Sequence, residues 1–236
     1  MKRIIKTRSP RELERWIHNQ QRLNLNLSYS TMPSQVKEKV LKSLLKEQGG
    51  ICCYTGIRIT TTTSHIEHLK PQSISRINND NDVNYSNLLA AYPHPDPASP
   101  DSLNCPYGAH KKADWYDENL FVHPLQADCE ERFIFDLEGN IKERTDDTAA
   151  KETLNQLELK HEKLVTMRKQ AIDELLFSRR LSEAQINELT ENIMQRDSNG
   201  NFRAFCFVLA QACRLYLRKV ERSRIRRTSI HRQNQD

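Results

Sequence analysis

The spacing of apolar residues predicts two amphipathic helices in the first 50 residues. In the stretch SPRELERWIHNQ, Ser9 can cap a helix, Pro10 suits the first helical position, and Glu12 completes a capping box. In SQVKEKVLKSLLKEQGG, aliphatic residues recur at helical intervals and the glycine pair Gly49-Gly50 ends the helix. The aliphatic positions of this second helix are Val36, Val40, Leu41, Leu44 and Leu45.

The pattern changes between Ile51 and about Asn119, where short apolar pieces alternate with threonine, proline and asparagine. ICCYTGIRI predicts a strand, a turn and a second strand, and YPHPDPASPDSLNCPYG predicts a long proline-rich loop, of a length typical of functional or disordered segments. RFIFDLEGNIKER alternates apolar and polar residues around the turn residue Gly139 and therefore indicates a hairpin.

After about Asp146 the chain is predicted to be helical to its end. Leucines and an alanine at helical spacing predict one long first segment, and Ser182 with Gln185 opens another helix. The last helix carries Cys206 and Cys213, seven residues apart on one face, where we expect buried thiols.

These elements divide the chain into three predicted regions. Residues 1–50 form a helical segment, residues 51–145 carry the chemically varied part and the hairpin, and residues 146–236 form a helical region with a basic tail. The fold class that follows is α+β and mostly helical.

Composition excludes some classes of protein. Hydrophobic residues make up 37% of the chain and charged residues 28%, which is typical of a globular protein. No apolar run approaches the roughly 20 residues that span a bilayer, and the start MKRIIKTRSPREL lacks the apolar core of a secretory signal. We therefore expect a cytoplasmic protein that does not associate with membranes.

The net charge of +5 is concentrated near the C-terminus. Between Arg214 and Arg232, eight lysines and arginines stand against the single acid Glu221. Such a run is usually a solvated helix surface, and it becomes a candidate phosphate-binding tail when nuclease chemistry is found elsewhere. Under that condition we expect Arg222 and Arg226 to contact nucleic acid.

Candidate catalytic residues lie in the middle region. His65, Glu67 and His68 fall within SHIEHLKPQS, Asn87 within NYSNLLAAY, and His110 within CPYGAHKKADW. Each is weak evidence alone, because paired histidines arise by chance and a loop asparagine is usually a turn residue. Together, His68, Asn87 and His110 form the series His, Asn, His in this order along the chain.

With these neighbours the sequence resembles the HNH endonuclease family, whose core is a β-hairpin and a helix around one metal ion. The family pattern is an acid-His pair before a proline, then Asn-Leu, then a histidine before basic residues. Two residues separate Glu67-His68 from a proline, Asn87 precedes a leucine, and His110 precedes two lysines. The resemblance therefore implies a central ββα-metal nuclease core.

The resemblance also implies a role for each residue. His68 would be the general base, since a neutral imidazole can take a proton from water at neutral pH. Asn87 would hold the loop so that His68 faces the scissile phosphate. Glu67 and His110 would bind the metal, and a carboxylate with an imidazole and open water positions suits Mg²⁺ or Mn²⁺.

Three neighbouring residues have weaker assignments. Lys111 and Lys112 are candidates for phosphate contact, and an exposed helix turn explains them equally well. His65 faces the same side of the predicted strand as Glu67, and a structural role is favoured over a metal or phosphate role.

The upstream CCYTG resembles the cysteine knuckle that precedes the core in many HNH proteins. A structural zinc of that type needs four cysteines in two pairs. Thr55 stands where the partner of Cys52 is expected, Cys53 lies too close to Cys52 to replace it, and the second pair has only Cys105. We therefore expect no complete structural zinc.

Further features are similar to the HNH subunits of Septu-type and retron-associated phage defence systems. These are the start MKRIIKTRSP, the HIEH motif and the ending FVHPLQADCEERFIFDLEGNI. The resemblance implies control by a separate ABC/SMC-like ATPase. The sequence itself lacks a phosphate-binding Gly-x-x-x-x-Gly-Lys loop, so an activity controlled by ATP would need such a partner. A retron reverse transcriptase with its RNA–DNA product is a further implied partner, and residues 146–236 are the candidate docking region.

Two other functions stay open on the sequence. The chain can be a restriction-type or RNA-directed HNH nuclease, because the motif acts on a phosphate that DNA and RNA share. It can also be a non-catalytic nucleic-acid-binding module. The presence of Glu67, His68, Asn87 and His110 together favours catalysis, with DNA as the expected substrate and RNA as the alternative.

Overall fold

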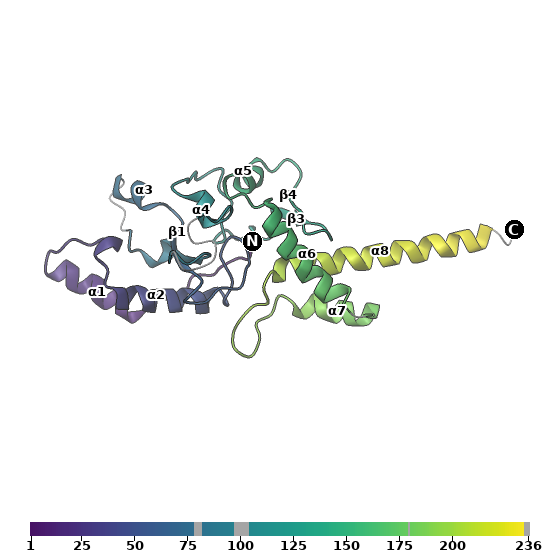
Figure 1. Ribbon diagram of the computed structural model, residues 1–236, viewed down its shortest axis with the longest axis horizontal. Helices are drawn as coiled ribbons and strands as arrows, with labels where there is room; N and C mark the ends of the chain where they lie inside the picture. The colour runs from purple at the N-terminus through teal and green to yellow at the C-terminus, as the bar shows by residue number, and fades with distance from the viewer. Residues whose placement is uncertain (78–81, 97–103, 179, 234–236) are drawn as a thin grey trace.

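The computed structural model describes residues 1–77, 82–96, 104–178 and 180–233, with side chains described outside 75–77 and 223–233. It shows helices and two small antiparallel sheets, so the predicted mostly helical α+β class is confirmed. α1, α2 and β1 lie toward one end of an elongated molecule, and α6 and α7 lie on the other side of its middle, where α8 begins before it runs to the opposite end (Figure 1).

The two N-terminal helices are α1 (Arg11–Arg22) and α2 (Ser34–Glu47), which pack against each other. α2 is confirmed as predicted, with Val40 and Leu44 fully buried. The predicted capping box of α1 is wrong. Pro10 occupies the N-cap with an extended backbone, and the Ser9 hydroxyl is buried without a hydrogen-bond partner among the described residues.

The central sheet pairs β1 (His65–His68) antiparallel with β2 (Leu88–Ala91), so that His65 lies opposite Ala91. A short 3₁₀ helix, η2 (Tyr85–Asn87), leads into β2, whose four residues are all buried. α2 packs against both strands. α3 (Gln72–Ile77) and the single-turn α4 (Ala109–Lys112) complete this part of the chain, and residues 97–103 of the predicted proline-rich loop lie outside the described residues.

The segment 51–59 is a tight turn, so the prediction of two strands there is wrong. The only ladder contact in the described segment is a single bridge between Ile51 and Arg58. The Cys53 N–H donates to the carbonyl of Ala90 in β2, at 3.2 Å, and is therefore not available to a hairpin partner. The segment is tied to the central sheet instead of forming a sheet of its own.

The second sheet is the predicted hairpin of β3 (Phe133–Phe135) and β4 (Ile141–Glu143), which is confirmed. Gly139 forms its turn with φ of +80°, a backbone region that favours glycine. A Cβ atom at this position would lie 2.5 Å from the carbonyl oxygen of Val165. The hairpin turn therefore packs directly on α6.

The described residues of the C-terminal region form four helices where three were expected. The chain breaks the predicted long segment near Glu158, whose φ is +48°, and buries Leu157 and Leu159 at the break. Ser182 and Gln185 form the predicted capping box. The helices are α5 (Thr148–Gln156), α6 (Glu162–Leu176), α7 (Glu183–Asn192) and α8 (Cys206–Gln233).

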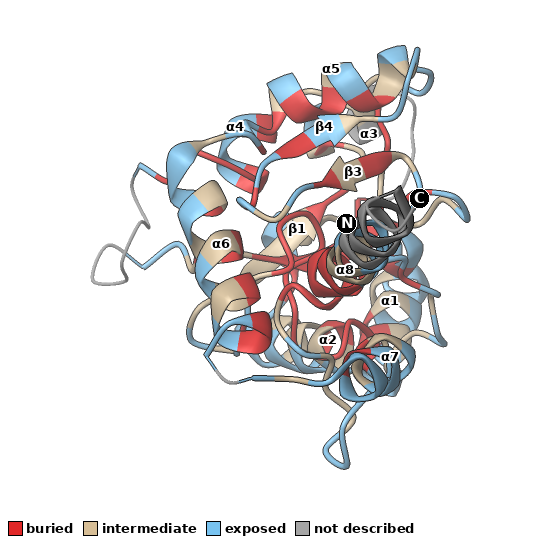
Figure 2. Ribbon diagram, turned by 90° about the vertical axis from the view of Figure 1, so that its right-hand side faces the viewer, coloured by how far each residue is buried: buried red, intermediate tan, exposed pale blue. Residues whose placement is uncertain are grey.

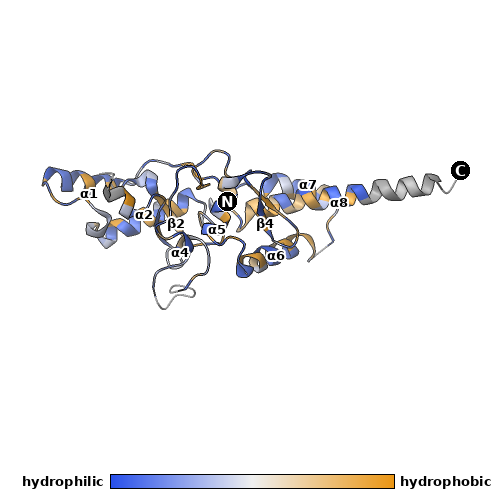
Figure 3. Ribbon diagram, turned by 90° about the horizontal axis from the view of Figure 1, so that it is seen from above, coloured by the Kyte–Doolittle hydropathy of each residue, from blue (hydrophilic) through white to orange (hydrophobic). Residues whose placement is uncertain are grey.

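α8 begins in the core and then leaves it. Cys206 and Cys213 are fully buried, as predicted, and Figure 2 shows buried residues gathered around the start of this helix. Over the coloured part of α8, orange hydrophobic residues near the start give way to blue hydrophilic ones (Figure 3). With 28 residues the helix is about 42 Å long, and its far half extends away from the other elements (Figure 1). Among the described residues, no helix combines the length and the apolar character that crossing a membrane requires.

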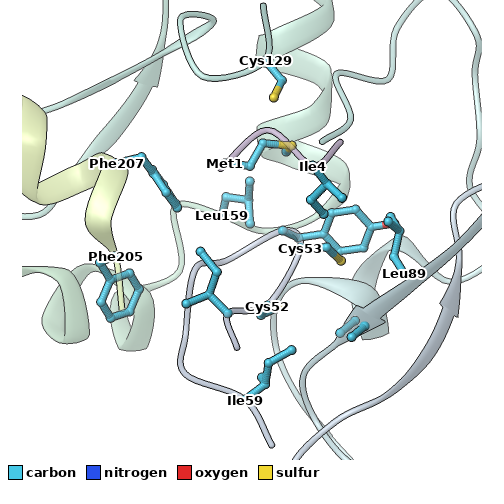
Figure 4. Close-up of a cluster of buried hydrophobic side chains, with 14 of the residues drawn as sticks. Met1, Ile4, Cys52, Cys53, Ile59, Leu89, Cys129, Leu159, Phe205 and Phe207 are labelled. Atoms are coloured by element: carbon cyan, nitrogen blue, oxygen red, sulfur yellow. The ribbon is translucent and has the colours of Figure 1, made fainter. Parts of the chain in front are cut away.

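The N-terminal residues join the two halves of the protein. Met1 and Ile4 are buried, and their side chains lie near Cys53, Cys129 and Leu159 (Figure 4). The backbone N–H of Ile4 donates to the carbonyl of Pro124, at 2.7 Å. One continuous core therefore runs from the central sheet to the start of α8.

Replacing Asp147 by Ala is expected to lower the free energy of unfolding by about 2 kcal/mol. The Asp147 carboxylate caps α5 by accepting the Ala150 N–H at 2.9 Å, and it pairs with the Arg132 guanidinium. Asp128→Ala is the matched control, because Asp128 contacts the same arginine at 3.3 Å with a side chain 58% exposed. Urea denaturation of the control should differ from wild type by less than about 0.5 kcal/mol. Equal losses in both variants would contradict this assignment.

The contribution of Asp147 should also depend on pH. Its hydrogen bond with Arg132 holds the pKa of the carboxyl below its ordinary value. The stabilisation is therefore fully present above that value, and it is lost as the pH falls through the lowered pKa. Wild type and Asp147→Ala should become similar in stability at strongly acidic pH.

Candidate active site

The end of β1 opens into a small hollow of about 330 Å³. β1 contributes its last two residues, and the turn into α3 and the residues after α4 form the other sides. The lining residues are Glu67, His68, Pro71, Gln72, Ser73, Ala113 and Asp114.

His68 is held as a neutral imidazole with a defined tautomer. Its Nε2 lies 2.8 Å from the backbone oxygen of Asp82. A carbonyl only accepts hydrogen bonds, so Nε2 carries the hydrogen and Nδ1 carries the lone pair. Nδ1 lies 3.4 Å from the amide nitrogen of Gln72, beside the hollow. Burial lowers the pKa of His68 more than Asp82 and Glu67 raise it, so the ring is uncharged at neutral pH.

Asp82 and Tyr29 support this imidazole, although no motif in the sequence singles them out. The Tyr29 ring meets the His68 ring edge-on at 4.7 Å between centroids. The Tyr29 N–H donates to Oδ1 of Asp82 at 2.8 Å. Tyr29, in the connection between α1 and α2, therefore holds Asp82 in place, and the carbonyl of Asp82 orients the His68 ring.

Glu67 is an ionised carboxylate whose two oxygens have different surroundings. Oε1 accepts from the Tyr54 hydroxyl at 3.2 Å and from the Lys112 ammonium at 3.0 Å. Oε2 lies 3.7 Å from Nε2 of His65. Burial raises the pKa of Glu67, but the hydrogen bonds and charges of His65 and Lys112 outweigh it and lower the pKa overall.

Lys112 is buried, which corrects the prediction that it is exposed for phosphate contact. Its side chain is 1% exposed, and Nζ donates to the backbone oxygen of His68 at 3.0 Å as well as to Glu67. The ammonium therefore stabilises the end of β1 through its contacts with Glu67 and His68. Lys111 is exposed, and its contact with phosphate stays a prediction.

The structure does not bring His110 into the hollow with Glu67. Residues two apart on a helix lie about 200° apart around its axis. Because Lys112 points from α4 toward β1, His110 points to the other side. His110 is exposed and is not among the described residues that line the hollow. Its role as a metal ligand stays a prediction.

Asn87 clamps the turn that follows β1. Its Oδ1 accepts the Lys70 N–H at 2.8 Å, and its Nδ2 donates to the Lys70 carbonyl at 2.9 Å. The Leu69 N–H donates to the Asn87 carbonyl at 2.9 Å. These three bonds fix the chain directly after His68.

Replacing Asn87 by Ala should therefore destabilise the protein by about 2 kcal/mol, because both Lys70 backbone groups lose their partner. Asn87→Asp is the graded control, since it keeps the acceptor for the Lys70 N–H but has no donor for the carbonyl. Thermal and urea unfolding should place the Asp variant between wild type and Ala. An Ala variant as stable as wild type would show that the hydrogen bonds between Asn87 and Lys70 do not stabilise the protein.

The cysteine segment is packed by protein contacts. Cys52 and Cys105 are buried, and the Cys105 thiol donates to the Tyr107 carbonyl at 3.4 Å. Gly108 follows Cys105 by three residues, as Thr55 follows Cys52, so a second cysteine of each pair would stand at these positions. The two positions are close together, because a Cβ atom on Gly108 would lie 3.3 Å from the methyl group of Thr55. Within the described ranges, no three His, Cys, Asp or Glu side chains are arranged to hold a metal ion.

A separate basic hollow of about 730 Å³ lies where α8 leaves the core. Arg214 and Arg218 of α8 line it, and it shares no described lining residue with the hollow at His68. Arg222 is exposed further along α8, while the side chain of Arg226 lies outside the described residues. The other basic residues that line this hollow are Lys2, Arg3 and Arg144. Glu130 and Glu131 also line it, and Glu130 pairs with Lys2.

Comparison with known proteins adds one relationship. No family model matches the sequence. A curated protein from Vibrio cholerae serotype O1 biovar El Tor, named "Retron Vc95 putative HNH endonuclease", is 24% identical over 201 residues. The chain therefore has a distant relative that is named as a putative HNH endonuclease. The alignment covers 83% of this chain and 92% of the relative, so it extends well beyond the site.

Proposed function

We propose that the chain is a metal-dependent HNH endonuclease that hydrolyses phosphodiester bonds in nucleic acid. The observation that carries this proposal is the neutral His68 beside the ionised Glu67 at the edge of one hollow. The order of the His, Asn and His motifs and the distant relative support it. In this reading β1, β2 and α4 are the ββα-metal core.

The proposed chemistry assigns the proton to a specific nitrogen. Nδ1 of His68 would accept a proton from the attacking water, because Nε2 already carries a hydrogen. The imidazolium that forms keeps its hydrogen bond to the Asp82 carbonyl and lies near the Glu67 carboxylate, both of which favour its positive charge. Asn87 keeps the backbone after His68 in place during this transfer.

Glu67 is the residue that fits a divalent cation. Its carboxylate is ionised, and Oε2 is not engaged by Lys112, which contacts Oε1. A bound Mg²⁺ or Mn²⁺ would supply positive charge to the phosphate and to the leaving oxygen. His110 is the second ligand in the family pattern.

We propose that DNA is the substrate, with RNA as the alternative. Lys111 in α4 and Arg222 on α8 are exposed and can neutralise phosphates, and Arg226 continues the basic run of the sequence. In this proposal α8 provides an arm that binds nucleic acid away from the hollow at His68.

We further propose that the nuclease is the effector of an anti-phage defence system of the cytoplasm. The name of the distant relative refers to a retron, which supports association with a reverse transcriptase and its RNA–DNA product. We propose in addition that a Septu-type ABC/SMC-like ATPase controls the activity of the nuclease. Residues 146–236 are the candidate docking region for that ATPase.

The test uses the purified full chain with supercoiled plasmid DNA or total RNA, in Mg²⁺, Mn²⁺ or EDTA, with and without the ATPase. We expect cleavage that requires the metal and that Glu67→Gln removes. Cleavage at the same rate in EDTA would contradict metal dependence. Retention of DNA in gel shifts without cleavage under any of these conditions would instead identify a binding module.

A further inference from the structure

We propose that His65, in place of His110, is the imidazole that completes the divalent metal site with Glu67. The proposal rests on the metal-dependent function proposed above and changes one ligand of its site. His65 and Glu67 are two residues apart on β1, so their side chains leave the same face of the strand.

The tautomer of His65 is the one that a metal ligand needs. Its Nδ1 lies 2.6 Å from the backbone oxygen of Pro93. Because a carbonyl only accepts, Nδ1 carries the hydrogen. Burial lowers the pKa of His65, but the hydrogen bond and charge of Glu67 raise it overall and favour a second proton on Nε2. A bound cation would take the place of that proton, since Nε2 carries the lone pair in the neutral ring. This nitrogen faces Oε2 of Glu67 at 3.7 Å.

The separation of these two atoms is close to that of two ligands on one ion. Ligands at about 2.1 Å from a metal are about 3.0 Å apart at a right angle and about 3.4 Å apart in a tetrahedron. Nε2 of His65 and Oε2 of Glu67 need to approach each other by less than 1 Å to reach about that range. Small side-chain rotations are sufficient for this movement.

Both residues also have the outer partners that orient metal ligands. The Pro93 carbonyl holds the second nitrogen of His65. Tyr54 and Lys112 hold the other oxygen of Glu67. Ligand histidines and carboxylates in metal sites usually have such hydrogen bonds on the atom away from the ion.

The pair is open enough for water ligands and for a phosphate oxygen. The side chain of His65 is 23% exposed and that of Glu67 is 13% exposed. One imidazole with one carboxylate favours a first-row divalent ion such as Mn²⁺ over Mg²⁺, because imidazole is the softer ligand. His110 lies on the side of α4 that faces away from Lys112 and hence from Glu67.

Binding of Mn²⁺ to the full-length protein, measured by electron paramagnetic resonance, tests the assignment without any nuclease assay. We expect His65→Ala to weaken Mn²⁺ binding by at least about 10-fold, as Glu67→Gln does, and His110→Ala to leave it unchanged. Circular dichroism and thermal unfolding show whether each variant is folded.

Spin-echo spectroscopy of bound Mn²⁺ gives a second readout that does not depend on His65→Ala folding. We expect the imidazole nitrogen coupling in wild type and in His110→Ala, and its loss in folded His65→Ala. Coupling that disappears in His110→Ala, or that is absent from wild type, overturns the proposal. In either case metal-dependent cleavage that Glu67→Gln abolishes would leave the proposed nuclease function standing.

Discussion

A His68→Gln variant is expected to cleave nucleic acid at least about 100-fold more slowly than wild type. Glutamine can still donate a hydrogen bond toward the Asp82 carbonyl, but its amide does not accept a proton at neutral pH. The loss should therefore appear in the rate of cleavage at saturating metal, while metal affinity changes little. Single-turnover cleavage of a labelled substrate measures this rate.

His123→Gln is the matched control. His123 is also an imidazole whose pKa is lowered by burial, and it lies outside the hollow at His68. The control should cleave at the wild-type rate. If His68→Gln is as fast as wild type, or if both variants are equally slow, His68 is not the general base.

A Lys112→Met variant is expected to lose about 3 kcal/mol of stability or more. Methionine fills a similar volume but leaves the Glu67 carboxylate and the His68 carbonyl without their shared donor. Removing the ammonium also raises the pKa of Glu67, since Lys112 lowers it in the folded protein. The loss should therefore shrink at acidic pH, where the carboxyl becomes protonated and no longer needs the cation.

Lys111→Met is the matched control for this change, because Lys111 is the exposed neighbour on the same turn. Its unfolding free energy should stay within about 0.5 kcal/mol of wild type. Urea unfolding of both variants makes the comparison. A Lys112→Met protein as stable as the control would mean that the ion pair with Glu67 contributes no net stability.

The elements that the sequence predicts correctly are those whose signals are local. The aliphatic face of α2, the capping pair Ser182 and Gln185, and the Gly139 turn each act within a few residues of the chain. The errors arise where a distant partner decides the conformation. The Cys53 N–H bonds to Ala90 in β2, so the segment 51–59 does not form its own sheet.

The candidate site shows the same division between residues with a local sequence signal and residues whose position depends on a distant partner. Glu67, His68 and Asn87 are recognisable from motif order, and the structure places them at the end of β1 and in the clamp that follows it. The burial of Lys112 was not predictable, because a lysine in a short basic run is usually exposed. Asp82 acts on His68 through its backbone oxygen, which leaves no signal in a side-chain pattern.

The most direct test of the account measures Mn²⁺ binding and cleavage together in wild type, Glu67→Gln and His68→Gln. We expect wild type to bind the ion and cleave, Glu67→Gln to lose both properties, and His68→Gln to keep the ion but lose cleavage. That pattern would separate the metal ligand from the general base at one site. Cleavage by His68→Gln at the wild-type rate, or unchanged Mn²⁺ affinity in Glu67→Gln, would contradict the account.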